Sequence, residues 1–131
     1  LQPWDDAREV LAQLAPHRRL GVVTNCSERL GRRAVAAVGV PFDVVVTAER
    51  AGFYKPDPTP YRLAVDELGV GRERVTFVAG SGFDLVGTAA VGLRTLWHNR
   101  AGLLPPPHAP APVAERGTLR ELLPFLLDGG H

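Results

Sequence analysis

The sequence predicts an α/β protein in which a parallel β-sheet is flanked by helices. Short, mostly apolar runs alternate along the chain with segments whose apolar positions recur at helical spacing, and this alternation is typical of crossover units. The apolar runs, such as the one at 20–24, lack the polar alternation of a strand with one solvated face. We therefore expect parallel strands that helices cover on both faces.

Each expected helix starts at a side chain that can accept a hydrogen bond from a free N–H group, or at a proline, and three of the helices end at a glycine. Each expected strand is an apolar run between two helices. In order, the expected elements are a helix from Asp5 or Asp6 to Pro16, a strand at 20–24, a helix at 27–38, a strand at 42–47, a helix at 58–68, a strand at 74–79, a helix at 84–91 and a strand at 93–97.

The end of the chain differs from residues 1–103, which hold these alternating elements and which we expect to form a partial core domain. Residues 104–116 are rich in proline and predict an extended segment on the surface. Residues 117–131 predict a C-terminal helix opened by Thr118, and Pro124 inside its pattern predicts a kink or a helix boundary.

The composition narrows the class of protein. With 131 residues, of which 45% are hydrophobic and 22% charged, the chain can bury the core of one globular domain. The net charge is +1 and the basic runs at 17–19 and 32–33 have no interleaved aromatic residues, so we expect no nucleic-acid partner. No apolar run approaches the roughly 18 residues that a membrane span needs, and no targeting segment opens the chain, so we expect a cytoplasmic protein without a membrane partner.

The single cysteine, Cys26, cannot form an internal disulfide, in agreement with a reducing compartment. A nucleophilic cysteine needs a histidine base, and the four histidines show no recognisable pairing with it. We expect a small, half-buried side chain at the end of a strand.

Lys55 is the only lysine in the chain, against fourteen arginines, and it lies in the segment Gly52-Phe53-Tyr54-Lys55-Pro56-Asp57-Pro58. A compact ammonium group fits between two anionic oxygens in a tight pocket, where a planar guanidinium fork does not. A composition biased towards arginine also explains a lone lysine, so the neighbouring residues decide between the two interpretations.

Three polar clusters follow the expected strands at their carboxyl ends, where parallel sheets bind ligands. Taken singly, the clusters are typical of a helix cap, a tight turn and a first-turn carboxylate. Together they bring a hydroxyl group, a cation and a carboxylate to one crevice, which predicts a site that handles an anion. The clusters are Thr24-Asn25-Cys26-Ser27, the Lys55 segment and Gly80-Ser81-Gly82-Phe83-Asp84.

These motifs resemble the second, third and fourth motifs of the haloacid dehalogenase superfamily, and most closely those of its type II, L-2-haloacid dehalogenases. The resemblance covers residues 5–103, and its most specific part is the Lys-Pro-Asp-Pro block with a tyrosine six residues after the lysine. It implies a Rossmann-like parallel sheet with flanking helices, of which this chain lacks the first strand and the helical cap. The matching motifs are Val22-Val23-Thr24-Asn25, 52–58 with Tyr61, 78–84 and Trp97-His98-Asn99-Arg100.

The resemblance implies a hydrolase that acts on a small 2-substituted carboxylic acid through an aspartyl ester. In this family a carboxylate displaces halide from the carbon beside the substrate carboxylate, and water then hydrolyses the ester. Lys55 would keep that nucleophile ionised, since a nearby cation lowers the pKa of a carboxyl group, and Asp84 would orient Lys55. The implied catalytic residues are Lys55, Thr24, Asp84 and Ser81, and the implied substrate-binding residues are Asn25, Tyr61, Phe83 and Asn99.

The chain departs from the family pattern because it holds neither the early strand with the nucleophile nor the cap. Asp5 and Asp6 follow Trp4 rather than a strand, so neither is nominated as the nucleophile. The chain begins at Leu1 and contains no methionine, so we expect it to be part of a longer protein. Without a central strand, backbone groups would lie unpaired in the core, and we expect a partner segment, either the missing N-terminal part or another copy of the chain in a homodimer.

The residue at position 79 helps to distinguish a dehalogenase from a Mg²⁺-dependent phosphatase, and here it is alanine. Phosphatases of the superfamily usually carry a Mg²⁺-binding carboxylate at this place, and alanine offers no ligand, which favours carbon chemistry without a metal or cofactor. A Mg²⁺-dependent phosphatase remains the first alternative, and a non-catalytic fragment or interaction module is the second. A two-component receiver domain does not fit, because its phosphoacceptor precedes its late lysine.

Overall fold

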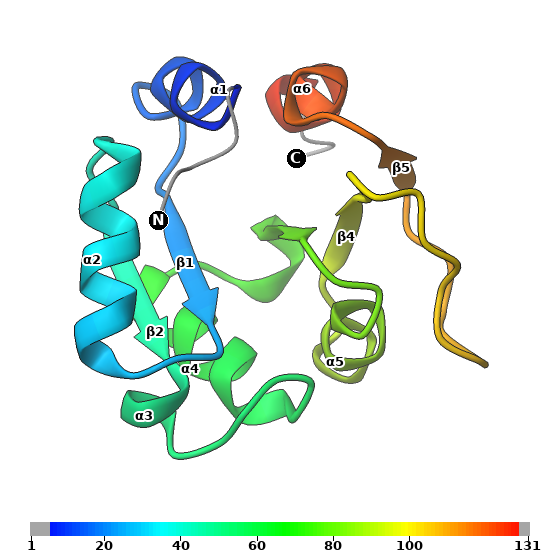
Figure 1. Ribbon diagram of the computed structural model, residues 1–131, viewed down its shortest axis with the longest axis horizontal. Coiled ribbons are helices and arrows are strands. Elements are labelled where there is room, and N and C mark those ends of the chain that lie inside the picture. The colour runs from blue at the N-terminus through cyan, green and yellow to red at the C-terminus, as the bar shows by residue number, and fades with distance from the viewer. Residues whose placement is uncertain (1–5, 129–131) are drawn as a thin grey trace.

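The computed structural model describes residues 6–128, and helices alternate with strands along this part of the chain (Figure 1). Residues 1–5, with Asp5, and 129–131 lie outside the described part. All strand pairs are parallel within it, which confirms the predicted α/β class. The elements are α1 (Ala7–Leu14), β1 (Gly21–Thr24), α2 (Glu28–Val38), β2 (Val44–Thr47), α3 (Ala48–Ala51), α4 (Pro58–Leu68), a 3₁₀ turn (Arg72–Arg74), β3 (Thr76–Ala79), α5 (Asp84–Val91), β4 (Arg94–His98), β5 (Ala114–Arg116) and α6 (Leu119–Asp128).

The strands form two half-sheets instead of one continuous sheet. β1 pairs with β2, and β4 lies between β3 and β5. Within residues 6–128, no strand joins β1 to β3, whose edges face each other across a gap (Figure 1). The interruption lies between the strands that end at Thr24 and Ala79, and the family resemblance implies that a central strand is missing from the sheet at this place.

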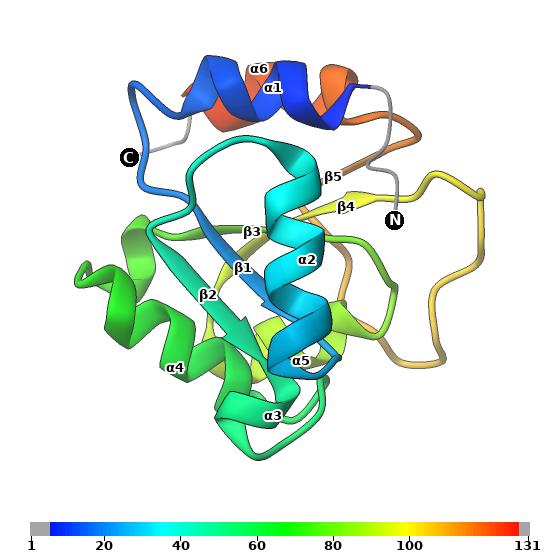
Figure 2. The same ribbon diagram turned by 60° about the vertical axis from the view of Figure 1, so that its left-hand side comes forward.

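Helices cover the two half-sheets on both faces, as the uninterrupted apolar strands predict. α1 and α6 lie side by side over one face, and α4 and α5 lie over the other (Figures 1 and 2). Leu14 of α1 packs with Leu119 and Leu126 of α6, whereas Ala64 of α4 packs against Val46 of β2. The gap between β1 and β3 is therefore enclosed by a helix layer on each side.

Local sequence signals explain where the helices begin and end. The Ser27 hydroxyl accepts a hydrogen bond from the Leu30 N–H at the start of α2, and Gly39 ends that helix with φ 74°, a left-handed conformation that favours glycine. Asp57 accepts a hydrogen bond from the Thr59 N–H, 2.9 Å away, and so caps α4. The aspartate of the Lys-Pro-Asp-Pro block therefore fixes the helix that follows the Lys55 loop.

Asp6 stands at the expected cap position of α1, but its side chain makes no capping hydrogen bond there. Its carboxylate instead accepts a hydrogen bond from the Arg120 N–H in the first turn of α6, 3.0 Å away. The helix pattern predicts the position of Asp6 and cannot predict this partner, because the partner is 114 residues away in sequence. The α6 helix also continues through Pro124 to Asp128, so the expected boundary is absent.

Besides the 3₁₀ turn at Arg72–Arg74, two short elements were not expected from the sequence. Ala114–Arg116 forms β5, within the stretch predicted to be an extended proline-rich segment. Its pattern of one buried and two exposed residues is that of a short edge strand, which carries too little apolar signal to be recognised. Ala48–Ala51 forms the single turn α3, which Thr47 caps. Among the described residues, no helix combines the length and apolarity that crossing a membrane requires.

Candidate active site

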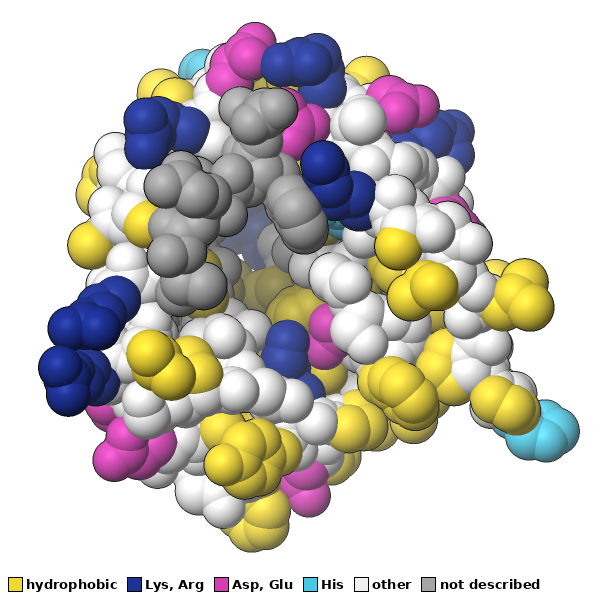
Figure 3. Space-filling view, viewed as in Figure 1, with side chains coloured by type: hydrophobic (Ala, Val, Ile, Leu, Met, Phe, Trp, Pro, Cys, Tyr) yellow, Lys and Arg dark blue, Asp and Glu magenta, His cyan; other side chains and the backbone are white. Residues whose placement is uncertain are grey.

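The polar clusters expected at the carboxyl ends of the strands meet at one end of a cavity between β1 and β3. The cavity has a volume of about 910 Å³ and runs along the gap between the half-sheets; we call it the slot. Figure 3 shows the surface hollowed between the two halves of the molecule. Five of the predicted site residues line the slot, namely Thr24, Lys55, Tyr61, Ser81 and Asp84.

Lys55 and Asp84 form an ion pair at this end of the slot. The Lys55 Nζ lies 3.3 Å from Asp84 Oδ1, and the two side chains are 17% and 3% exposed. The ammonium also lies 5.9 Å from the centre of the Phe77 ring, a distance at which the ring face attracts a cation. A largely buried cation is thus held from one side and is still among the residues that line the slot.

Tyr61 also binds the carboxylate of Asp84. Its side chain is fully buried, and its hydroxyl donates a short hydrogen bond to Asp84 Oδ1. Burial and this hydrogen bond raise the pKa of Tyr61 far above its usual value, so it stays a donor at all ordinary pH values. Its ring packs edge to face on Phe77, with 5.2 Å between the ring centres. Asp84 is therefore oriented by two donors on one oxygen.

Asn25 binds the backbone of Lys55 through both ends of its amide. The Asn25 Nδ2 donates to the Lys55 carbonyl oxygen at 3.1 Å, and the Lys55 N–H donates to Asn25 Oδ1 at 2.7 Å. This pair of hydrogen bonds joins the loop after β1 to the Lys55 loop. The sequence predicts Asn25 as a substrate-binding residue, and its side chain in this structure holds the lysine loop.

Ser81 and Phe83 lie in the loop before α5. The Ser81 N–H donates to Asp84 Oδ2 at 3.4 Å, and the Ser81 hydroxyl accepts a hydrogen bond from the Phe83 N–H. The Phe83 side chain is 61% exposed, so it stands at the surface. The Thr24 hydroxyl lies 3.5 Å from the sulfur of half-buried Cys26.

Asn99 is not brought to the slot. Its side chain is buried, and its amide hydrogen bonds join Leu103 and Glu115 across the start of the proline-rich segment. Its role as a substrate-binding residue stays a prediction. The structure brings together Thr24, Asn25, Lys55, Tyr61, Ser81 and Asp84, and it leaves Asn99 apart from them.

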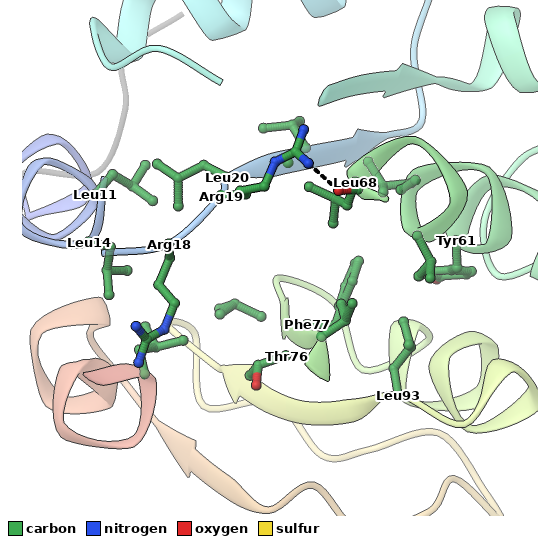
Figure 4. Close-up of a pocket in the computed structure, with 18 of the residues that line it drawn as sticks. Leu11, Leu14, Arg18, Arg19, Leu20, Tyr61, Leu68, Thr76, Phe77 and Leu93 are labelled. Atoms are coloured by element: carbon green, nitrogen blue, oxygen red, sulfur yellow. Dashed lines mark hydrogen bonds between the residues drawn. The ribbon is translucent and has the colours of Figure 1, made fainter. Parts of the chain in front are cut away.

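The walls of the slot are apolar on both faces. Leucines of α1 and α6 line one wall, and apolar side chains of α4 line the other (Figure 4). Asp84 is the only carboxylate among the described residues that line the slot. The same lining contains Lys55 and three arginines, so the slot holds an excess of positive charge. The apolar lining comprises Val10, Leu11, Leu14, Leu119 and Leu126 on one wall and Tyr61, Ala64, Val65 and Leu68 on the other.

Arginines lie at the other end of the slot, at the amino ends of the strands, and the sequence did not predict them as site residues. Arg18 donates to the carbonyl oxygen of Leu127 at 2.9 Å, and Arg19 donates to that of Leu68 (Figure 4). Both lie in the connection between α1 and β1. The basic run at 17–19, expected to be a solvated face, thus also binds the ends of α4 and α6.

The residues of the site do not fit a magnesium ion by themselves. Ala79 is fully buried and carries no ligand, and both oxygens of Asp84 already accept hydrogen bonds. Within the described part of the chain, no group of three or more His, Cys, Asp or Glu side chains could hold a metal. The donor set around Lys55 suits an anion.

Two contacts of the site could not be found by sequence reasoning. The Asn25 amide meets the Lys55 backbone across 30 residues, and the Tyr61 hydroxyl meets Asp84 across 23. A tyrosine inside an apolar helical stripe was the available signal for the second contact, because a buried hydroxyl needs a partner. No comparable signal existed for the first.

Comparison with known proteins identifies the family. The family model described as haloacid dehalogenase-like hydrolase matches residues 1–98. The chain is 32% identical over 130 residues to (S)-2-haloacid dehalogenase 4A of Burkholderia cepacia, a match that covers 96% of this chain and 56% of that protein. It is also 32% identical over 121 residues to the phosphoserine phosphatase of Thermus thermophilus, covering 87% of this chain and 48% of that protein.

A solved structure of a haloacid dehalogenase has a similar fold. The L-2-haloacid dehalogenase from Xanthobacter autotrophicus with chloropropionic acid covalently bound superposes with a TM-score of 0.88 at 25% identity, and the match covers 97% of this chain and 62% of that one. The chain therefore spans less than two thirds of the length of each of these relatives.

Proposed function

This chain belongs to the haloacid dehalogenase-like hydrolases, and from that premise we propose that the whole protein hydrolyses (S)-2-haloacids or closely related 2-substituted carboxylic acids. The observation that carries the proposal is the buried ion pair of Lys55 and Asp84 at the carboxyl ends of β1 and β3. Asp84 uses one side of the ammonium, which leaves the other side for an anion in a slot that is otherwise apolar at its centre.

The slot is suited to one more strand, parallel to β1 and β3. Both of these strands have an edge without a partner among the described residues, and an unpaired backbone group in an apolar core costs about 1 to 3 kcal/mol. Because both walls of the slot are apolar, the strand should be apolar on both faces. Its carboxyl end would lie beside Lys55.

A carboxylate at that end would be the nucleophile. One of its oxygens attacks C2 of the substrate, the carbon–halogen bond breaks, and halide leaves with the bonding electrons. Water then attacks the carbonyl carbon of the ester, which releases the 2-hydroxy acid and a proton and restores the carboxylate. In this scheme Lys55 holds the nucleophile ionised, Thr24 donates to the substrate carboxylate, and Ser81 helps to place the water.

The remaining side chains would shape the pocket. Tyr61 orients Asp84 and closes one wall, and Phe83 offers an apolar surface at the mouth. Asn25 fixes the lysine loop through its side chain, which leaves its N–H group for the substrate. Asn99 would act from the loop after β4.

The decisive experiment measures halide release by the whole protein from a panel of 2-haloacids, with a chelator present. We expect release from (S)-2-haloacids, and we expect the Lys55→Met variant to be slower by about 10²-fold or more. Absence of release from every member of the panel would remove the dehalogenase assignment.

A phosphatase is the second candidate, since the similarity to a phosphoserine phosphatase covers 87% of this chain. It predicts release of phosphate from phosphate esters that depends on added Mg²⁺. Buried Ala79 counts against it. Phosphate release without halide release would reverse the order of the two candidates.

The partner segment can be tested with the 131-residue chain alone. We expect this chain to need the strand, supplied by its own N-terminal part or by another copy in a homodimer, before it melts cooperatively. The measurement is thermal unfolding with and without a peptide of apolar residues that ends in aspartate, combined with the sedimentation mass. A cooperative transition of the monomer without peptide would contradict the expectation and favour a self-sufficient interaction module.

A further inference from the structure

Gly87 lies in the middle of α5, at the point where that helix touches both the Lys55 loop and α4. An added Cβ atom on Gly87 would lie 2.3 Å from Cε2 and 2.7 Å from Cζ of Tyr61. It would also lie 2.8 Å from the carbonyl oxygen of Pro56, the residue after Lys55. These separations are far below van der Waals contact, so only a residue without a side chain fits this position.

The neighbours of Gly87 cannot easily move away. The Tyr61 ring is fully buried, packs on Phe77 and belongs to the same apolar cluster as Val91 and Leu93. The Pro56 oxygen is a backbone atom, so it moves only if the Lys55 loop moves. A methyl group at position 87 would therefore displace the ring, the loop or the helix.

Each of these displacements acts on the same ion pair. Asp84 lies one turn before Gly87 on α5, and its Oδ1 accepts the Tyr61 hydroxyl and pairs with Lys55 at 3.3 Å. The absence of a side chain at one helix position thus brings three elements close enough for this contact. Nothing else in the sequence of α5 requires glycine, because the helix continues through this position to Val91.

We propose that Gly87 is a positioning residue that sets the location of the Lys55 ammonium through the Tyr61 ring and the Pro56 carbonyl. The proposal rests on the proposed function only where it concerns activity, since the position of the ammonium can be measured without a substrate. It assigns to a glycine a role in the chemistry that is distinct from chain flexibility.

The test uses the single lysine of the chain. When the chain is labelled with carbon-13 lysine and combined with its unlabelled strand segment, Lys55 gives the only lysine side-chain signal in the NMR spectrum. We expect the Gly87→Ala variant to shift this signal, and the Tyr61→Phe variant to shift it as well. In the halide assay of the whole protein, G87A should lower kcat by about 10²-fold and leave KM within about twofold, because the atoms nearest to an added Cβ belong to Tyr61 and Pro56 and not to Thr24 or the loop after β1.

The matched control is Gly117→Ala, since an added Cβ at this exposed glycine meets no atom within 4 Å. We expect G117A to leave the Lys55 signal and kcat unchanged. A Lys55 signal in folded G87A that coincides with that of the parent and of G117A would overturn the proposal. If the Lys55 signal shifts in G87A but the parent protein releases no halide, the result would support the positioning role and contradict the proposed function.

A second variant keeps the test decisive if G87A does not fold. In the G87A/Y61L double variant the ring atoms that the methyl group meets are gone, and the methyl group takes part of the space that the ring leaves. We expect the double variant to regain the cooperative unfolding transition and to show a shifted Lys55 signal. Tyr61→Leu alone is the reference for this comparison, because it removes the ring and its hydrogen bond to Asp84 without adding the methyl group. If Tyr61→Leu folds and the double variant does not, removal of the ring does not make room at position 87, and the part of the proposal that acts through the Tyr61 ring is overturned.

Discussion

The two ends of the slot both carry basic side chains, and they use them differently. At the carboxyl ends of the strands, Lys55 pairs with the buried carboxylate of Asp84. At the amino ends, Arg18 and Arg19 donate to backbone carbonyl oxygens of Leu127 and Leu68. The planar guanidinium groups bind the C-terminal ends of two helices, and the compact ammonium group lies where a second anion can approach it. The direction of the strands, rather than the number of charges, separates the end where we propose the chemistry, called the chemical end below, from the structural end.

Replacement of Lys55 should have the largest effect and tests whether the chemical end depends on its cation. We expect Lys55→Met to lower the rate of halide release by about 10²- to 10³-fold. It should also destabilise the fold by about 3 kcal/mol, because Asp84 would remain buried without its cation. Activity assays and urea unfolding of the whole protein measure the two effects.

Lys55→Arg is the matched variant that keeps the charge and changes its shape. If the shape of the cation matters, halide release by the Lys55→Arg variant should remain at least about tenfold slower than by the parent. Parent-like activity of this variant would show that charge alone distinguishes the two ends.

Asp84→Asn should have the next largest effect. The amide keeps the shape of the side chain but no longer pairs with the ammonium, so we expect halide release to fall by about 10²-fold. The unfolding free energy should fall by about 2 kcal/mol, because a buried, charge-assisted contact is lost. An Asp84→Asn protein with the activity of the parent would remove Asp84 from the site.

Tyr61→Phe should have a smaller effect, because the ring and its packing remain. Loss of the hydroxyl group leaves Asp84 with one donor fewer, and we expect a loss of stability of about 1 to 2 kcal/mol. The rate of halide release should fall by about tenfold.

Alkaline unfolding provides a second measurement of the same hydroxyl group. The pKa of Tyr61 is raised in the folded protein, so the folded state keeps a proton that the unfolded chain loses above about pH 10. The stabilisation is therefore fully present below pH 10 and is lost as the pH rises beyond it. Tyr61→Phe should lose less stability than the parent between pH 9 and about 11.5, as measured by urea unfolding at each pH. An identical slope for both proteins would contradict the buried hydrogen bond.

Replacement of Arg19 by methionine should have the smallest effect and is the control at the structural end. The guanidinium group of Arg19 binds one carbonyl oxygen, in an exposed setting, so we expect a loss of stability of at most about 1 kcal/mol. Halide release should stay within about twofold of the parent. A large loss of activity in Arg19→Met would break the distinction between the two ends.

The sequence could predict most of the fold because its signals are local. The apolar runs, the cap at Ser27 and the proline at position 58 act within a few residues, and the helices that begin there appear at 28–38 and 58–68. β5 escaped prediction because its three residues include two exposed charged side chains. Its place in the sheet comes from pairing with β4, and this pairing produces no recognisable sequence pattern in so short a segment.

For the candidate site, the sequence could predict the meeting place and only part of the contacts. Strand direction alone brings Thr24, Lys55 and Asp84 to one edge. The partners of Asn25 and Asn99 could not be predicted, because an amide binds whatever backbone the tertiary fold brings to it. The close contact at Gly87 could not be predicted either, because the Tyr61 ring that it accommodates belongs to another helix.

The contact of Asp6 with the Arg120 N–H has a consequence for the order of folding. One wall of the slot is built from α1 and α6, which lie at opposite ends of the described chain and are joined by this hydrogen bond and by the ion pair of Arg120 with Glu9. During synthesis, the wall cannot close before α6 has left the ribosome, so the leucines of α1 lack their partners in α6 while the strands form. Contacts of such long sequence separation form slowly. The slot should thus be the last part of the molecule to be enclosed, and until then the proposed additional strand could enter from the side.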